Sequence, residues 1–308
     1  MPSTATGAAA GTGKGAARRR TGRTLGRLAP ILPAVLLLAS FLLGPILYSL
    51  YGSLTNRAMS GYRAASPEFI GLDNYTSLLS DPGFLRSVAL TAVFVLASAI
   101  VGQNVLGMVL AVLMRHAPRP LPSVVGGIVV VAWVLPEIVA AFACYAFFSS
   151  DGTLNAILAA LGLPEPSWLL NLPMLSVILA NVWRGTAFSM MVYHAALAEV
   201  PPDVIESAQI DGAGPFQRFT RITLPMIRRS IATNLMLITL QTLGVFTLIW
   251  VMTGGGPGTS SSTLPVLAYQ EAFKFSQVGY GTAIATVTLV VGAVFSLVYM
   301  RVLRPEVD

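Results

Sequence analysis

Charged side chains are the scarcest feature of this sequence. Asp, Glu, Lys and Arg make up only 10% of its 308 residues, whereas an ordinary soluble domain carries roughly 25%. Hydrophobic residues make up 55%. This balance indicates a protein that lies in a membrane rather than in water.

Cysteine and histidine are also rare, and their scarcity excludes several kinds of site. Cys144 is the single cysteine, so the chain forms no disulfide within itself. His116 and His194 lie far apart and have no cysteine or acidic cluster beside them, so no metal site is predicted. No Ser, His and Asp set accompanies a nucleophile-elbow pattern, so the sequence gives little support to an intramembrane enzyme.

A complete phosphate-binding loop is missing as well. The piece GAAAGTGKG near the amino terminus has the required Lys14, but Ala8 stands where the first glycine is needed and Gly15 replaces the Ser or Thr. No strand precedes it. By this test the chain has no ATP site and no cofactor of its own.

Six apolar runs are long enough to cross a bilayer, which takes about 20 residues. The runs are Ile31–Tyr51, Val88–Leu113, Val124–Phe148, Met174–Leu197, Ile231–Met252 and Thr282–Leu303. Pro45 and Pro136 fall inside two of them and are expected to be kinks, since neighbouring helices of a bundle can re-satisfy the backbone. The sequence therefore predicts an all-α integral membrane protein with six transmembrane helices.

The distribution of Lys and Arg predicts how these helices are oriented. If the amino terminus is cytoplasmic, 14 of the 19 Lys and Arg residues lie on the cytoplasmic side, 4 lie outside and Arg184 lies within a span. Cytoplasmic loops are the ones enriched in these residues, so both termini are predicted to be cytoplasmic. This topology and the attraction of anionic membrane lipid account for the net charge of +6 without a nucleic-acid partner.

The chain divides into three predicted parts. Residues 1–28, rich in Ala, Gly, Thr and Arg, are predicted to form a disordered basic cytoplasmic tail. Residues 29–86 contain the first transmembrane helix and an external loop, and the apolar run there is too long for a signal peptide. Residues 87–304 form the main transmembrane domain, which includes a cytoplasmic loop at 199–229.

The most informative segment is the polar part of that loop, Glu199–Pro225. Pro202 suits the first turn of a helix, where a missing N–H costs nothing. Gly212 breaks this helix, because glycine readily adopts the left-handed conformation of a sharp turn. Pro215 then begins a second helix, which Leu224 and Pro225 end. The apolar face of this helix–turn–helix has nothing of its own to pack against, so the loop is predicted to dock into another protein.

The same residues carry a resemblance to a known family. Glu206-Ser207-Ala208, then Gly212, then Ile222 and Leu224-Pro225 after nine residues, resemble the coupling loop of ABC importer permeases, whose pattern is EAA, three residues, G, nine residues, I-x-L-P. Ser207 replaces the first Ala, and its small size should preserve docking. The resemblance implies that the loop contacts a cytoplasmic ATPase through ten residues: Glu206, Ser207, Ala208, Asp211, Gly212, Ala213, Phe219, Ile222, Leu224 and Pro225.

Further motifs extend the resemblance over residues 69–303. FIGLDNY, the run Trp133–Pro136, the run Asn181–Gly185 and the turn TGGGPG occur in an order similar to that of carbohydrate-importer permeases. The TGGGP turn and the carboxyl terminus resemble the first permease subunit of maltose- or glycerol-3-phosphate-type systems.

Such a subunit has the all-helical ABC importer permease core and lies in the inner or plasma membrane of a bacterium. The resemblance implies a heterodimer with a sister permease, two copies of an ATPase that binds ATP and Mg²⁺, and an extracytoplasmic solute-binding lipoprotein or periplasmic protein. ATP hydrolysis is then expected on the partner rather than on this chain, which would form the path for a sugar.

Polar side chains at mid-bilayer depth are costly and are functional candidates by default. At a helical rise of about 1.5 Å per residue, five of them fall near one depth: Glu137, Arg184, Gln241, Gln103 and Asn104. Their carboxylate, guanidinium and amide groups can pair hydrogen bonds with sugar hydroxyls. Trp133, Phe246 and Trp250 offer aromatic faces to a pyranose ring. These eight residues are the predicted substrate path.

Each of these residues also has a purely structural interpretation. Glu137 and Arg184 carry opposite charges at one depth, so an ion pair between helices is favoured over sugar contact for Arg184. For Glu137 and Gln241 both interpretations stay open. Aromatic residues in membrane spans more often pack than stack on a ligand.

Two other classes of function also remain open. An ion-coupled secondary transporter or channel would use Glu137 and Arg184 as a charge relay and would need no ATPase. A membrane-embedded receptor or scaffold would recruit an ATPase through the loop without passing solute. Vanadate sensitivity of uptake tests the first, and solute flux in reconstituted vesicles tests the second.

Overall fold

The computed structural model of this chain describes residues 30–118 and 120–303. The predicted disordered tail at 1–28 lies outside the described residues. The chain forms two units, one ending at Tyr51 and one beginning at Gly52. Most of the described residues are helical, and the only β-type pairing among them is an isolated bridge between Thr55 and Phe69. The prediction of an all-α protein is confirmed for this part of the chain.

Four continuous helical segments are long and apolar enough to cross a membrane. The first consists of α2 (Leu32–Leu38), η1 (Ala39–Leu43) and α3 (Gly44–Ser53), and the second of α6 (Pro82–Phe94), η2 (Val95–Gln103) and α7 (Asn104–His116). The other two are α12 (Pro173–Ala198) and α19 (Val278–Leu303). Each of the four segments overlaps one predicted span. Their ends lie within a few residues of the predicted ends, although the second segment begins earlier than predicted.

Two further helix pairs are apolar enough to span but are bent. The helix α8 (Pro120–Val134) is bent by 106° from the segment Glu137–Ala160, which begins with α9 (Glu137–Phe148), and α16 (Arg228–Leu243) and α17 (Thr247–Thr253) meet at 48°. The first break falls at Leu135 and Pro136, because a residue before proline is driven out of the helical region. Pro136 was predicted to be a kink, and it instead separates two helices.

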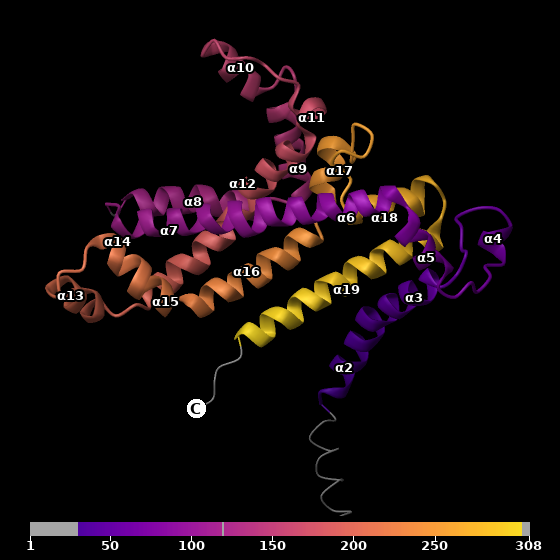
Figure 1. Cartoon of the computed structure of the whole chain (residues 1–308), viewed down its shortest axis with the longest axis horizontal. Coiled ribbons are helices and arrows are strands. Elements are labelled where there is room, and N and C mark those ends of the chain that lie inside the picture. The colour runs from indigo at the N-terminus through magenta and orange to yellow at the C-terminus, as the bar shows by residue number, and fades with distance from the viewer. Residues whose placement is uncertain (1–29, 119, 304–308) are drawn as a thin grey trace, which may run out of the picture. The chain divides into compact units, whose positions relative to one another are not determined.

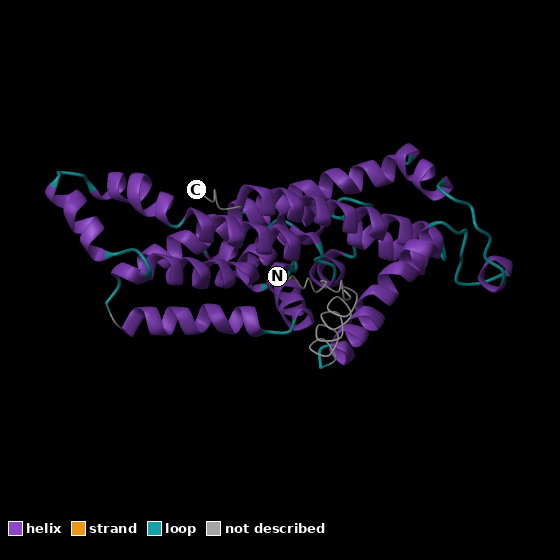
Figure 2. Cartoon of the chain, turned by 90° about the horizontal axis from the view of Figure 1, so that it is seen from below, coloured by secondary structure: helices purple, strands orange, loops and turns teal. Residues whose placement is uncertain are grey.

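Short helices connect these segments. They are α4 (Tyr62–Ala65), α5 (Asp73–Ser80), α10 (Thr153–Ala160), α11 (Trp168–Asn171), α13 (Pro202–Ile210), α14 (Pro215–Arg218), η3 (Phe219–Thr223), α15 (Leu224–Met226), α18 (Leu264–Tyr269) and η4 (Gln270–Lys274). The elements labelled η are π-helical turns. Helices and loops account for all the coloured chain in Figure 2.

Two of the π turns immediately precede a proline inside a helix. In η1 the N–H of Gly44 donates to the carbonyl of Ala39, just before Pro45. In η3 the N–H of Leu224 donates to the carbonyl of Phe219, just before Pro225. Since proline lacks an N–H and its ring clashes with the carbonyl four residues back, the wider π turn lets the helix continue through it. The second loop helix therefore runs to Met226, one residue past the predicted end at Leu224 and Pro225.

The helix α12 packs very closely against η2 and α7. A Cβ on Gly102 would lie 2.3 Å from a methyl carbon of Val182, and one on Gly107 would lie 2.5 Å from the Cβ of Ser189. The backbone N of Met190 lies 2.9 Å from that second position. These glycines allow the helix backbones to approach, as small residues do between membrane helices.

At the end of the second unit farthest from α13, polar contacts join the start of α6 to α19 (Figure 1). The hydroxyl of Tyr280 donates to Oδ2 of Asp81 at 3.0 Å, and Oδ1 of Asp81 accepts the N–H of Gly83. Burial, and then the nearby charge of Asp81, raise the pKa of the Glu271 carboxyl.

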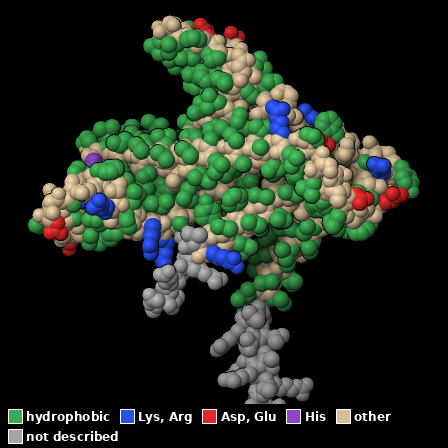
Figure 3. Space-filling view, in the orientation of Figure 1, with side chains coloured by type: hydrophobic (Ala, Val, Ile, Leu, Met, Phe, Trp, Pro, Cys, Tyr) green, Lys and Arg blue, Asp and Glu red, His purple; other side chains and the backbone are tan. Residues whose placement is uncertain are grey.

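Hydrophobic side chains cover most of the visible face of the molecule, and few charged side chains interrupt it (Figure 3). Such a face suits a surface in contact with lipid.

Candidate functional site

The predicted loop is a helical hairpin between α12 and α16, and it lies at one end of the second unit (Figure 1). Its first helix, α13, has Pro202 in the first turn and ends at Ile210. Gly212 follows in the left-handed conformation, with φ of 83°, and donates its N–H to the carbonyl of Gln209. The N–H of Ala213 donates to the carbonyl of Ala208. These bonds satisfy the last carbonyls of α13 and confirm the predicted glycine turn.

The tip of this hairpin exposes large apolar side chains. Ile210 is 86% exposed and Phe216 is 78% exposed, and Val204 and Met226 are also exposed. Of the ten predicted docking residues, Glu206, Ser207, Asp211, Gly212 and Pro225 are exposed, Ala213, Phe219, Ile222 and Leu224 are half-buried, and Ala208 is buried. A solvent-exposed apolar tip on a polar loop marks an interaction surface.

The base of the hairpin is fixed to the helices around it. Val200 and Ile227, which flank the hairpin, are 3% and 4% exposed and pack in one apolar cluster with Tyr193 and Ala111. Arg115 of α7 donates to the carbonyl of Leu197 at 2.8 Å, near the end of α12. A firmly held base and an exposed tip suit a segment that transfers movement.

Glu137 links the two breaks in the bent helix pairs. It is the first residue of α9, and its Oε1 accepts the backbone N–H of Leu248 in α17 at 3.2 Å. Because Leu248 lies in the first turn of α17, this N–H has no partner within its own helix. The Glu137 carboxylate therefore caps the amino terminus of α17, while Glu137 itself is the first residue of α9.

The favoured ion pair between Glu137 and Arg184 is not formed. In the described part of the chain no carboxylate lies within salt-bridge distance of Arg184, whose Nε is buried without a hydrogen-bond partner. Depth along a helix does not fix the direction in which a side chain points, and Glu137 turns to α17 instead.

Gln103 and Asn104 both serve contacts between helices. The Gln103 amide is 3% exposed, donates to the carbonyl of Asn181 at 3.1 Å and packs against Gly185, where a Cβ would lie 2.2 Å from its Oε1. Asn104 accepts a hydrogen bond from the hydroxyl of Tyr193. These contacts favour a structural role for the two amides in this conformation.

Gln241 and the aromatic candidates occupy different surroundings. Gln241 is exposed, and Trp133 lies 5.9 Å from the ring of Phe188. Phe246 and Trp250 stack at 5.8 Å. Of the eight predicted path residues, Phe246 and Trp250 contact each other, whereas the contacts given above for Glu137, Gln103, Asn104 and Trp133 are to residues outside the set.

Three residues that the sequence reasoning missed extend the aromatic group. The ring of Tyr269 lies 4.7 Å from Trp250 and 5.2 Å from Phe273, and Nζ of Lys274 lies 4.6 Å from the centre of the Trp250 ring. The spacing Tyr269, Phe273 signals one helical face. The sequence does not single out this face, because the segment follows a glycine-rich turn and is predicted to be an outside loop.

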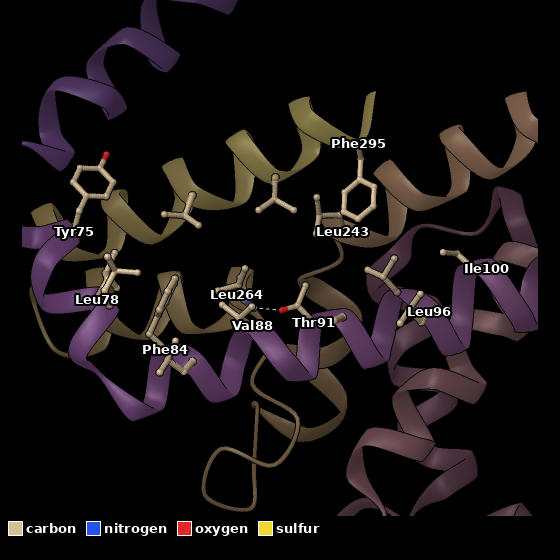
Figure 4. Close-up of a pocket in the computed structure, with 16 residues that line it drawn as sticks. Tyr75, Leu78, Phe84, Val88, Thr91, Leu96, Ile100, Leu243, Leu264 and Phe295 are labelled. Atoms are coloured by element: carbon tan, nitrogen blue, oxygen red, sulfur yellow. Dashed lines mark hydrogen bonds between the residues drawn. The ribbon is translucent and has the colours of Figure 1, made fainter. Parts of the chain in front are cut away.

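An apolar hollow of about 520 Å³ lies between α5, α6, η2, α18 and α19. Figure 4 shows its aromatic and aliphatic lining, with Thr91 accepting the backbone N–H of Leu264 at 2.9 Å. Since sugar binding requires placed polar groups, this hollow is a poor candidate for a carbohydrate. A more polar hollow of about 480 Å³ lies at the ends of α9, α11 and α17, where Ser149, Ser150, Ser167 and Thr253 line it.

Comparisons with known protein sequences agree on one family. The family described as "binding-protein-dependent transport system inner membrane component" matches residues 103–308. The chain is 31% identical over 277 residues to the sulfoquinovosyl glycerol transport system permease protein SmoG of Agrobacterium fabrum, covering 89% of each protein. It is 32% identical to the trehalose/maltose transport system permease protein MalF of Thermococcus litoralis, covering 89% of this chain and 92% of that protein.

Solved structures share the fold. The chain resembles a bacterial ABC transporter involved in the import of the acidic polysaccharide alginate, with a TM-score of 0.78 at 24% identity, covering 94% of this chain and 99% of that chain. It also resembles the MetNI methionine ABC transporter, with a TM-score of 0.52 at 17% identity over 75% of this chain and 97% of that chain. The helical architecture is therefore that of an ABC transporter permease.

Proposed function

Because the chain belongs to the family of binding-protein-dependent transport system inner membrane components, we propose that it is a permease subunit of an ATP-driven carbohydrate importer. The observation that carries this proposal is the hairpin at α13–α15, with a buried base and exposed Ile210 and Phe216. ATP hydrolysis belongs to a separate ATPase subunit. This chain forms part of the path for the solute and the contact that couples ATP hydrolysis to transport.

The proposed topology has six transmembrane helices, with each bent pair counted as one span and both termini in the cytoplasm. In this orientation 14 of the 19 Lys and Arg residues lie on the cytoplasmic side, which supports it. The orientation puts the hairpin on the side where ATP is available. The proposed location is the plasma membrane of a bacterium.

The proposed assembly contains a sister permease as a heterodimer partner, two ATPase subunits with ATP and Mg²⁺, and an extracytoplasmic solute-binding protein. Closure of the ATPase dimer on ATP would move the hairpin, whose ten predicted residues lie in a cleft of the ATPase. Rigid-body rotation of the attached helices would then switch the path between inward- and outward-facing states.

The proposed cargo is a sugar or another hydroxylated solute. The named transport activities of several relatives support a carbohydrate, for they include sulfoquinovosyl glycerol and trehalose/maltose. The half-buried Glu137 at the two helix breaks and the polar hollow around Ser150 supply acceptors and donors for hydroxyl groups. An ion-coupled mechanism gains less support, because the charge relay would need Glu137 and Arg184 to be adjacent.

Uptake by cells tests this function directly. Cells lacking the gene are expected to lose vanadate-sensitive uptake of one carbohydrate from a labelled panel, and the wild-type gene is expected to restore it. Uptake that continues with vanadate but stops when the membrane potential collapses would favour the ion-coupled alternative. Unchanged uptake of every sugar would contradict the carbohydrate assignment.

Replacing Glu137 tests its place in the path. Glu137→Gln retains an oxygen that can accept the Leu248 N–H but loses the charge, so we expect normal assembly and uptake reduced about tenfold through weaker hydrogen bonding to the cargo. Glu137→Ala also leaves the N–H unpaired, which should cost about 1–3 kcal/mol of stability. Initial uptake rates and thermal unfolding in detergent measure the two effects.

The exposed Glu165 in the loop before α11 provides the control. Glu165→Gln removes the same charge outside the helix breaks and should leave both measurements unchanged. Wild-type uptake by Glu137→Gln would assign Glu137 a purely structural role.

A further inference from the structure

A chain of buried and half-buried polar side chains connects three helices beside the hairpin. Asn234 of α16 is fully buried, and its Nδ2 donates to Oγ of Ser189 at 3.1 Å and to the hydroxyl of Tyr193 at 2.9 Å. Tyr193 of α12 is also fully buried and donates its hydroxyl proton to Oδ1 of Asn104 on α7. We call Asn104, Tyr193 and Asn234 the polar knot.

The knot lies where the two ends of the hairpin enter the bundle. Tyr193 is in the last two turns of α12, which leads into the hairpin, and Asn234 is in the second turn of α16, which leads out of it. The Tyr193 ring belongs to the same apolar cluster as Val200 and Ile227 at the hairpin base. Displacement of the hairpin therefore reaches the knot through the last turns of α12 and the first turns of α16, beside the contacts that Ala111 and Arg115 make at the base.

Close packing and the hydrogen bond from Gln103 to the carbonyl of Asn181 already resist sliding of α12 against η2 and α7. The knot adds directional hydrogen bonds that also join α16, and such bonds weaken steeply when donor and acceptor shift. The knot is also costly, because Oδ1 of Asn234 is buried without a partner. A polar network of this kind suits positioning better than it suits stability.

We propose that Asn104, Tyr193 and Asn234 are positioning residues that make α7, α12 and α16 move as one body with the hairpin. The inference rests on the proposed function, because it assumes that an ATPase moves the hairpin. Without the knot, the hairpin would still dock and the ATPase would still turn over, but α12 would slide against its neighbours instead of carrying them.

Spin-label distances in the assembled transporter test this inference. One label is placed at His116→Cys, at the end of α7, and one at Asp151→Cys, after α9; both positions are exposed. Cys144 is buried and its labelling is measured separately. In the parent protein, Mg-ATP with vanadate is expected to shift the distance distribution. Tyr193→Phe and Asn234→Leu should reduce that shift by about half or more while ATP hydrolysis persists.

Thr239→Val is the matched control. Thr239 is a fully buried residue of α16 whose hydroxyl has no hydrogen-bond partner, so its removal should leave the shift unchanged. Asn104→Ala, at a half-buried position, provides a second variant that disturbs packing less than changes at α16.

The possible outcomes separate the two proposals. A parent protein with no nucleotide-dependent shift would contradict the proposed coupling, and the knot with it. A normal parent shift that Tyr193→Phe and Asn104→Ala both retain would overturn the knot alone. Variants that lose assembly and ATP hydrolysis together would assign these residues to folding rather than to transmission.

Discussion

Replacing Gly212 with proline is expected to abolish ATP-driven uptake while the protein still inserts in the membrane. Gly212 has φ of 83°, whereas proline fixes φ near −65°. Proline would also remove the N–H that Gly212 donates to the carbonyl of Gln209. The two hairpin helices would then leave the turn in different directions. Uptake should fall at least about tenfold, within the range of about 5- to 150-fold that is typical of an allosteric coupling.

The choice of substituent provides a graded series at this position. A Cβ on Gly212 meets no atom within 4 Å, so the chain itself has room for a side chain. Gly212→Asn should retain much of the uptake, because asparagine tolerates the left-handed conformation. Gly212→Arg should lose uptake as Gly212→Pro does, because arginine adds backbone strain and a bulky charge on the docking surface. Normal uptake by Gly212→Pro, measured beside equal membrane levels, would refute the coupling role.

Replacing Gly107 with valine is expected to cause the largest loss of stability. The first added carbon would lie 2.5 Å from the Cβ of Ser189 and 2.9 Å from the backbone N of Met190. No rotamer change can remove a clash with backbone, so α7 must move away from α12. Overpacking typically costs about 1–3 kcal/mol, and we expect the upper end of that range. Thermal unfolding in detergent and the yield of membrane-inserted protein measure it.

Gly127 supplies the comparison within the same chain. It lies in α8, another apolar helix, and a Cβ there meets no atom within 4 Å. Gly127→Val carries the same change in helix propensity and lipid contact without the clash. Equal melting temperatures for the two variants would show that the close approach of α7 to α12 is not maintained in solution.

Hydrophobic runs and turn chemistry were sufficient to predict most of the helices. The cores of α12 and α19 fall within their predicted spans, and the left-handed turn at Gly212 follows from glycine itself. Both depend on local properties of the chain. The π turns before Pro45 and Pro225 did not follow, because the choice between ending a helix and widening it depends on the surrounding packing.

The candidate path was harder to predict, because it depends on which way side chains point. Glu137 and Arg184 were matched by depth, yet the partner of Glu137 is a backbone N–H on α17. Periodicity cannot reveal an N–H freed by a helix break whose angle is unknown. The polar knot could have been noticed, since Tyr193 and Asn234 are polar groups within apolar runs like the residues that were selected.

The two interrupted helices also affect how much energy a rearrangement requires. Bending a continuous helix would break backbone hydrogen bonds, each worth about 0.5–1.5 kcal/mol. Here the helical hydrogen bonds are already interrupted between Val134 and Glu137 and between Leu243 and Thr247. The Glu137 carboxylate joins α9 to α17 across these breaks. A tilt of α9 with α17 about these two joints can therefore proceed without melting any helical turn.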